Sequence, residues 1–163
     1  MTETCYYRSP IRYFILEADD TGLMRLEFYS GPCEQSAPKN PHLQDAFRWL
    51  DEYFSGRQPD FTPALHLQGT EFQKQVWHKV MEIPYGSTAS YGDIASAIAG
   101  ERGIKKMAAQ AVGQAVGANR ICLIIPCHRV MGVNGAITGY GGGIHNKIAL
   151  LKHEGTTTKT RKR

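Results

Sequence analysis

The sequence predicts an α/β protein in which a small α/β unit is followed by a helical unit. Residues 11–28 carry aromatic and branched side chains on both sides of a turn sequence, Asp-Asp-Thr-Gly, which indicates two strands. Residues 69–119 hold three successive helical segments, two of which open with a capping-box pattern. The net charge is −4 over residues 1–65 and +8 over residues 66–163, so the two halves differ in surface character.

In the first unit, residues 1–66, we expect strands at 11–18 and 23–28 and one helix over 40–56. Four apolar residues recur there at helical spacing, Leu43, Phe47, Leu50 and Phe54. Gly56 ends the helix, and the Pro-rich residues 57–69 read as a linker. Because this unit holds no cluster of catalytic residue types, we interpret it as a scaffold.

The second unit, residues 67–155, begins with two capped helices. Thr70 precedes Gln73 by three residues, and Ser90 precedes Asp93 by the same spacing. The first helix presents an apolar face formed by Phe72, Val76, Val80 and Ile83. Pro84 and Gly86 end this helix, and Gly100 ends the second.

The third helix, from near Ile104 to Asn119, consists mostly of small residues, namely Ala108, Ala109, Ala111, Gly113, Ala115, Gly117 and Ala118. Such a helix either packs tightly against another helix or enters a groove too narrow for larger side chains. Lys105 and Lys106 at its start could reach phosphates. Two helices joined by a turn in a basic region have the outline of a DNA-binding helix-turn-helix, although many helical hairpins bind nothing.

The basic second half fits a polyanionic partner, nucleic acid first, and it fits a solvated basic surface equally well, so charge alone leaves both readings open. We expect the tail, residues 156–163, to be disordered. No apolar run approaches the ~20 residues that span a bilayer, and the N-terminus lacks a secretory pattern. We therefore expect no membrane partner and a cytoplasmic location, or a nuclear one in a eukaryote.

The four cysteines show no common zinc-binding spacing, so we expect free thiols and no metal site. Cys127 follows an apolar run, residues 121–125, that we interpret as a buried strand. A thiol at the end of a rigid strand becomes a nucleophile when an adjacent base takes its proton. His128 is next in sequence, but neighbours on an extended backbone point to opposite sides, so a bend or a bridging water is needed. Glu154, in the last helix, is a candidate to orient the imidazole. By contrast, we expect Cys122 to be an inert core thiol.

Several ordered motifs closely resemble those of the O6-alkylguanine-DNA alkyltransferases, the suicide DNA-repair proteins. They are SYGDIA (90–95), AVGQAVGAN (111–119), IIPCHRVMG (124–132), NGAITGYGGG (134–143) and KIALLKHEG (147–155). The resemblance spans residues 69–155, and the first half matches in outline. It implies a ribonuclease H-like N-terminal α/β domain and a C-terminal helical domain with a winged helix-turn-helix.

The resemblance also implies the reaction. The small-residue helix would enter the minor groove of double-stranded DNA, and the O6-alkylguanine would be flipped into a pocket. Cys127 would take the alkyl group in one displacement, with no cofactor and no regeneration. His128 would remove the thiol proton through a water while Glu154 holds His128. Tyr91 would donate to the base and Asn119 would tie the recognition helix to the active-site strand. The same reaction on O4-alkylthymine stays open.

The other residues that the resemblance implicates fall into two sets. The DNA-contacting set is Gln110, Lys105, Lys106, Ala109, Ala111 and Gly113. The pocket set is Val130, Tyr140, Gly141, Gly142 and Lys147. Tyr91 could instead be a core aromatic and Asn119 a plain helix C-cap, while we read Arg129 as structural and paired with a carboxylate. We expect a monomer in solution.

One departure from the family pattern concerns Gln110, where relatives commonly have an arginine that fills the gap left by the flipped base. Glutamine can hydrogen-bond to an orphaned cytosine but carries no charge. We therefore hypothesise weaker extrusion, with slower repair or a different lesion preference. The alternative function is an alkyl-damage-binding protein with weak or no transfer. A helix-turn-helix regulator would leave the Cys-His pair unexplained, and a Cys-His hydrolase would turn over.

Overall fold

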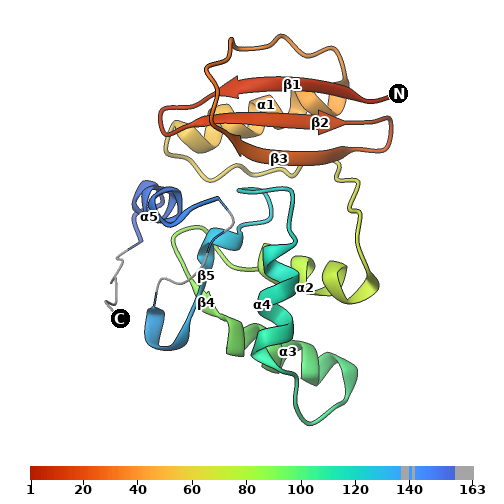
Figure 1. The fold of residues 1–163 in the computed structure, drawn as a ribbon, viewed down its shortest axis with the longest axis vertical. Coiled ribbons are helices and arrows are strands. Elements are labelled where there is room, and N and C mark those ends of the chain that lie inside the picture. The colour runs from red at the N-terminus through yellow and green to blue at the C-terminus, as the bar shows by residue number, and fades with distance from the viewer. Residues whose placement is uncertain (137–139, 141, 157–163) are drawn as a thin grey trace. The chain divides into compact units, whose positions relative to one another are not determined.

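The computed structural model describes residues 1–136, 140 and 142–156 (Figure 1). The chain forms two compact units, Met1–Gln68 with Arg120–Ile124, and Gly69–Asn119 with Ile125–Arg163. We expected the domain boundary after residue 66, and the first unit ends at Gln68. This unit also includes a later segment, Arg120–Ile124. Most of the tail for which we expect disorder, residues 157–163, lies outside the described residues. No helix among the described residues is long and apolar enough to cross a membrane.

The first unit contains a three-stranded antiparallel sheet in the order β1-β2-β3, made of β1 (Glu3–Arg8), β2 (Tyr13–Ala18) and β3 (Leu23–Tyr29). The two predicted strands are present, but β1 was missed. Its signal was the alternation of buried Cys5 and Tyr7 with more exposed neighbours. The turn between β2 and β3 forms as predicted, because Asp19 Oδ1 accepts hydrogen bonds from the backbone N–H groups of Thr21 and Gly22.

Helix α1 (Pro41–Phe54) covers one face of this sheet (Figure 1). Asn40 caps its first turn by accepting from the N–H of His42 at 2.8 Å. Of the apolar residues that predicted the helix, Leu43, Phe47 and Leu50 are buried. The chain leaves the helix through Gly56, whose φ of 91° lies in the left-handed region that glycine tolerates best.

The second unit contains α2 (Glu71–Met81), α3 (Tyr91–Arg102), α4 (Ala109–Gly117) and α5 (Ile144–His153). Helices α2, α3 and α4 pack on one another. Both predicted capping boxes are present, since Thr70 and Ser90 each accept from the backbone of the third helical residue, whose side chain reaches back. The buried residues of α2 include Trp77, whose indole N–H donates to the carbonyl of Ala115 in α4 at 2.8 Å.

Two predicted helix ends are wrong. Helix α3 passes through Gly100 and ends at Arg102, because Gly103, with φ 67°, adopts the left-handed conformation that closes a helix. Helix α4 therefore starts at Ala109 rather than near Ile104. Lys105 and Lys106 lie in the exposed turn before it instead of in its first turn.

The predicted buried strand at residues 121–125 is also wrong, although the segment is buried. Only Ile121 makes a β-bridge, to Leu26, and the chain then turns. Leu23 and Leu26 are the bridge residues on this edge of β3, and Leu123 has a φ of 70°, which is incompatible with a continuing strand.

After this turn the chain forms a short 3₁₀-helix, η1 (Cys127–Arg129), and the strand β5 (Val130–Met131). Strand β5 pairs in parallel with β4 (Ala89–Ser90), with Ala89 opposite Val130 and Ser90 opposite Met131. A second 3₁₀-helix, η2 (Val133–Gly135), follows. Because β4 leads directly into Tyr91 and β5 directly follows Arg129, this ladder places the start of α3 beside the Cys-His segment.

Candidate active site and DNA-binding face

The candidate nucleophile, Cys127, lies in the first position of η1 and is 6% exposed. Pro126 precedes Cys127, and the backbone N–H of Cys127 donates to the carbonyl of Ile125 at 2.7 Å. The 3₁₀ turn supplies the bend that an extended backbone would lack, so Cys127 and His128 need not point to opposite sides. Such an enclosed thiol is out of reach of a base stacked inside a duplex.

His128 and Arg129 share one buried carboxylate, that of Glu154. Nε2 of His128 lies 2.6 Å from Oε2 of Glu154. Arg129 donates to the same carboxylate through Nε at 2.8 Å and Nη2 at 3.1 Å, and through Nη1 to the carbonyl of Ile83. Its guanidinium also lies over the ring of Tyr85. The prediction that Arg129 pairs with a carboxylate is confirmed.

Burial and this network determine the protonation states. Burial lowers the pKa of His128, and Glu154 opposes that shift. Burial alone raises the pKa of Glu154, but the hydrogen bonds and charges of His128 and Arg129 lower it to about 2. At neutral pH the carboxylate is therefore ionised and the imidazole is neutral.

The neutral imidazole has one nitrogen available as a base. Nε2–H donates to Glu154, so Nδ1 carries the lone pair. Within the described part of the chain, Nδ1 is buried and has no hydrogen-bond partner. Nδ1 is therefore the ring nitrogen that can take a proton, and it belongs to the residue next to Cys127 in the chain.

Asn119 connects the end of α4 to the thiol. Its side-chain amide donates to the carbonyl of Ile125 at 3.1 Å and to Sγ of Cys127 at 3.3 Å. The C-cap residue of α4 is Ala118, so a plain helix cap does not describe this side chain. Asn119 instead links the candidate recognition helix to the candidate nucleophile.

Lys147, on α5, is fully buried and donates to the carbonyl of Val130 at 2.7 Å. Burial lowers its pKa to about 8, and an electrostatic interaction with Cys127 opposes that shift. Its ammonium also lies 5.9 Å from the ring centroid of Tyr140. Gly142 is half-buried, and Gly141 lies outside the described residues. Four of the five predicted pocket residues are thus described, and three of them are joined by contacts around Lys147.

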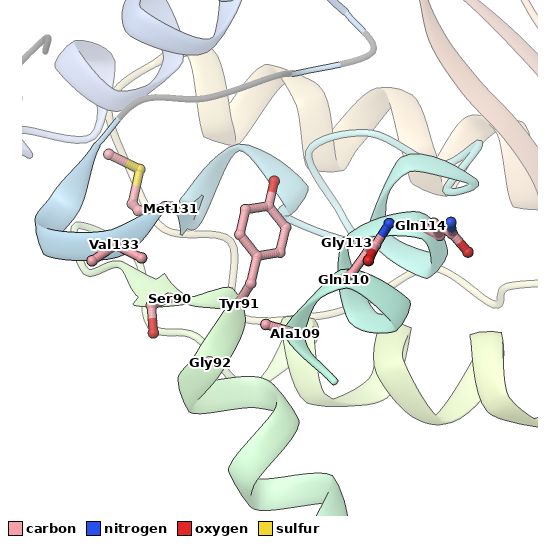
Figure 2. Close-up of a pocket in the computed structure, with 10 residues that line it drawn as sticks. Ser90, Tyr91, Gly92, Ala109, Gln110, Gly113, Gln114, Met131 and Val133 are labelled. Carbon is pink, nitrogen blue, oxygen red and sulfur yellow. The ribbon is translucent and has the colours of Figure 1, made fainter. Parts of the chain in front are cut away.

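A cavity of about 680 Å³ opens between the start of α3, one face of α4 and the segment after β5. Its lining comprises Ser90, Tyr91, Gly92, Ala109, Gln110, Gly113, Gln114, Met131, Gly132 and Val133. Figure 2 shows the Tyr91 ring standing between Met131 and Val133 on one side and α4 on the other. Tyr91 is half-buried, and it lines the cavity rather than the core. Cys127 is not among the lining residues.

The small residues of α4 do not serve tight packing, with the exception of Ala115, which is buried. A methyl group added at Gly113 would meet Tyr91 at an ordinary 3.8 Å, and one added at Gly117 would meet nothing within 4 Å. Ala108 and Ala109 are exposed. This contradicts close helix packing as the reason for the composition and leaves an open face with little side-chain bulk.

The other candidate DNA contacts lie on or near this open face. Gln110 and Ala109 are exposed and line the cavity, while Ala111 is half-buried. Lys105 and Lys106 are exposed in the turn before α4. Sequence reasoning missed Gln114, Met131 and Val133 as cavity residues. Gln114 carried a signal, because it follows Gln110 by one helical turn.

No group of three metal-ligating side chains gathers among residues 1–136, 140 and 142–156. All four cysteines are free thiols, as predicted, and burial raises the pKa of Cys5 to about 12. Cys5 is therefore a poor nucleophile at neutral pH.

Two family models together cover most of the chain. The DNA binding domain of 6-O-methylguanine DNA methyltransferase matches residues 71–156, and the ribonuclease-like domain of the same family matches residues 4–67. The methylated-DNA--protein-cysteine methyltransferase of Mycobacterium bovis is 52% identical over 150 residues, which cover 90% of this chain and 88% of that protein. The Methanosarcina acetivorans protein of the same name is 41% identical over 155 residues, covering 92% and 96%.

Solved structures show the same likeness. Mycobacterium tuberculosis O6-methylguanine methyltransferase superposes with a TM-score of 0.77 at 40% identity, covering 94% of this chain and 93% of that one. The crystal structure of Mycobacterium tuberculosis OGT in complex with DNA also gives 0.77, at 41% identity, covering 91% and 90%. The predicted α/β fold class, with an N-terminal sheet domain and a C-terminal helical DNA-binding domain, is confirmed.

Proposed function

This chain belongs to the 6-O-methylguanine DNA methyltransferase family, and we propose that Cys127 is the residue that accepts the alkyl group. The chain is a DNA repair protein that acts by alkyl transfer to a cysteine of its own, once per molecule. The observation that supports Cys127 is the buried network beside it, in which Glu154 holds His128 so that Nδ1 is free to take a proton. Of the four cysteines in the sequence, Cys127 alone is followed directly by a histidine.

The reaction on Cys127 is a single displacement. Nδ1 of His128 takes the thiol proton through a bridging water, and Sγ forms a bond to the alkyl carbon on O6 of guanine. The bond between the alkyl carbon and O6 breaks, and its electron pair stays with the guanine, which is then protonated. Glu154 stabilises the imidazolium that forms, as a carboxylate behind a catalytic histidine does. The thioether product is a poor leaving group, so the cysteine is consumed.

The enclosure of Cys127 requires the base to leave the duplex. At 6% exposure the thiol cannot meet a stacked base, whereas a flipped nucleotide can enter a pocket. Tyr91 stands in the adjacent cavity and would donate a hydrogen bond to the departing base as negative charge develops on it. Asn119 would keep α4 and the thiol in register while the base moves.

The substrate is double-stranded DNA that carries O6-alkylguanine, read from the minor groove. The open face of α4 supports binding in the minor groove, because a helix with little side-chain bulk fits a groove only about 6 Å wide. Lys105 and Lys106 would contact phosphates from the preceding turn. Gln110 lies on the cavity rim, where it would occupy the position of the extruded base with weaker stacking than an arginine. We extend the proposal to O4-alkylthymine, whose alkyl group is also carried on an exocyclic oxygen, and to action as a monomer.

The test is the intact mass of the protein after incubation with duplex DNA that carries O6-methylguanine. We expect a gain of one methyl group per chain, mapped to Cys127 by peptide digestion. Cys127→Ala should bind the same duplex without any gain in mass. A methyl group on Cys122 or Cys33 would show that the acceptor is misassigned. Binding without any gain in mass would favour the damage-binding alternative. The relatives' shared name, which states methyl transfer to a cysteine, argues against that alternative.

A further inference from the structure

Helix α4 carries two hydrogen-bonding side chains in its described length, Gln110 and Gln114. Both are exposed and both line the 680 Å³ cavity. We propose that Gln114 is a specificity-determining residue that reads the minor-groove edge of a base pair near the lesion. This inference rests on the proposed function, because it assumes that α4 faces the minor groove.

The position of Gln114 follows from the packing of α4. Val112, Ala115 and Val116 are buried, and Trp77 anchors that side through the carbonyl of Ala115. The opposite side carries Gln110 and Gln114, both of which line the cavity; Figure 2 shows the two side chains on α4. Residues four apart lie on one helix face and differ by about 6 Å along the axis.

That separation matches the spacing of base pairs. Base pairs stack about 3.4 Å apart, so two side chains about 6 Å apart along a groove reach pairs roughly two steps from each other. If Gln110 occupies the position of the extruded base, Gln114 lies within about three steps of the lesion. Its neighbours on this face, Gly113 and Gly117, have no side chain that could compete for the same base edge.

The chemistry of the amide determines what Gln114 can distinguish. In the minor groove, A·T and T·A pairs present acceptors alone, and a G·C pair adds the N2 amino donor of guanine. A lysine or arginine could only donate there, whereas the amide oxygen of glutamine accepts. The discriminating contact is therefore a hydrogen bond from guanine N2 to Oε1 of Gln114, which favours repair next to a G·C pair.

The experiment measures binding of the full chain carrying Cys127→Ala, which prevents covalent transfer, to duplexes with one central O6-methylguanine. Every pair within three steps of the lesion is G·C, and each guanine is replaced singly by inosine, which lacks the N2 amino group. At one position we expect inosine to weaken binding about three- to tenfold, the value of one hydrogen bond. Adding Gln114→Ala should weaken binding to the all-G·C duplex by a similar factor and abolish the inosine effect at that position.

Gln110→Ala is the matched control, since it removes the other amide of the same helix face. It should lower affinity for the duplex but retain the inosine effect. The inference is overturned if no position responds to inosine, or if Gln114→Ala keeps the full inosine response. Methyl transfer by the unsubstituted protein to the same duplexes separates the two proposals. Transfer without an inosine effect rejects the role of Gln114 alone, whereas the absence of transfer to every duplex rejects the proposed function.

Discussion

Replacing Gly113 by alanine should stabilise the protein and impair its action on DNA at the same time. The substitution adds one methyl group in the middle of α4. Its nearest neighbours would be ring atoms of Tyr91 at 3.8 Å, an ordinary van der Waals contact, so no clash is expected. Alanine is favoured over glycine in a helix interior, and we expect the free energy of unfolding to rise by about 0.5–1 kcal/mol.

The same methyl group projects into the cavity where we expect DNA to approach the backbone. An extra methyl group in a close-fitting contact costs about 1–3 kcal/mol, which corresponds to a loss of affinity of roughly 5- to 150-fold. The transfer rate at low protein concentration should fall by a similar factor. Stability and DNA binding therefore change in opposite directions, which a general folding defect could not produce.

The assay combines urea denaturation, fluorescence anisotropy with O6-methylguanine duplex, and the rate of methyl transfer. Gly100→Ala is the matched control, because it adds a methyl group to another helix, α3, with nothing within 4 Å and outside the lining of this cavity. It should leave binding and transfer unchanged. If Gly113→Ala destabilises the fold, the glycine serves packing. If it binds DNA as tightly as the parent, α4 does not approach the DNA through this face.

Three further predictions concern the buried network and its support. Glu154→Gln leaves the Arg129 guanidinium buried without its carboxylate, and should cost about 3–5 kcal/mol in urea denaturation; a loss below about 1 kcal/mol would contradict the network. Because the pKa values of Glu154 and His128 are lowered on folding, the unfolded chain binds more protons than the folded one at acid pH. The free energy of unfolding should therefore fall as the pH drops below 6.5 and fall further from 4.5 toward 2, and the transfer rate should decline only below pH 6.5. A stability maximum at pH 5, or a decline in transfer centred above pH 6.5, would show that these groups are not buried as described. Trp77→Phe removes the donor to the Ala115 carbonyl and should cost about 1–3 kcal/mol in thermal or urea unfolding, with an unchanged midpoint counting against that contact.

The elements that local chemistry specifies could be predicted closely. The capping boxes at Thr70 and Ser90 mark the starts of α2 and α3 because each is a contact between residues three apart. The periodic apolar face of α1 and the Asp-Thr-Gly turn after β2 are local in the same way. The start of α4 was misjudged because the helix-forming residues 104–108 are held in a turn by the left-handed Gly103.

The candidate site could be predicted as a set of residues but not as an arrangement. Cys127, His128, Glu154 and Asn119 were identifiable from motifs. The motifs did not show that His128 contacts Glu154 through Nε2 and leaves Nδ1 as the base, because Glu154 lies 26 residues further along the chain. The expected strand at 121–125 also hid the 3₁₀ turn that bends the chain between the thiol and the imidazole.

By itself the sequence determined the fold class, the capped helices and the family, since these depend on residue order and on contacts within one or two helical turns. The tertiary structure decided which face of α4 is open, which carboxylate serves both His128 and Arg129, and how a lysine comes to be buried against the Val130 carbonyl. The physical reason is that burial and charge pairing are properties of the packed chain. A desolvated imidazole or ammonium takes its proton affinity from groups that only folding brings within a few ångströms.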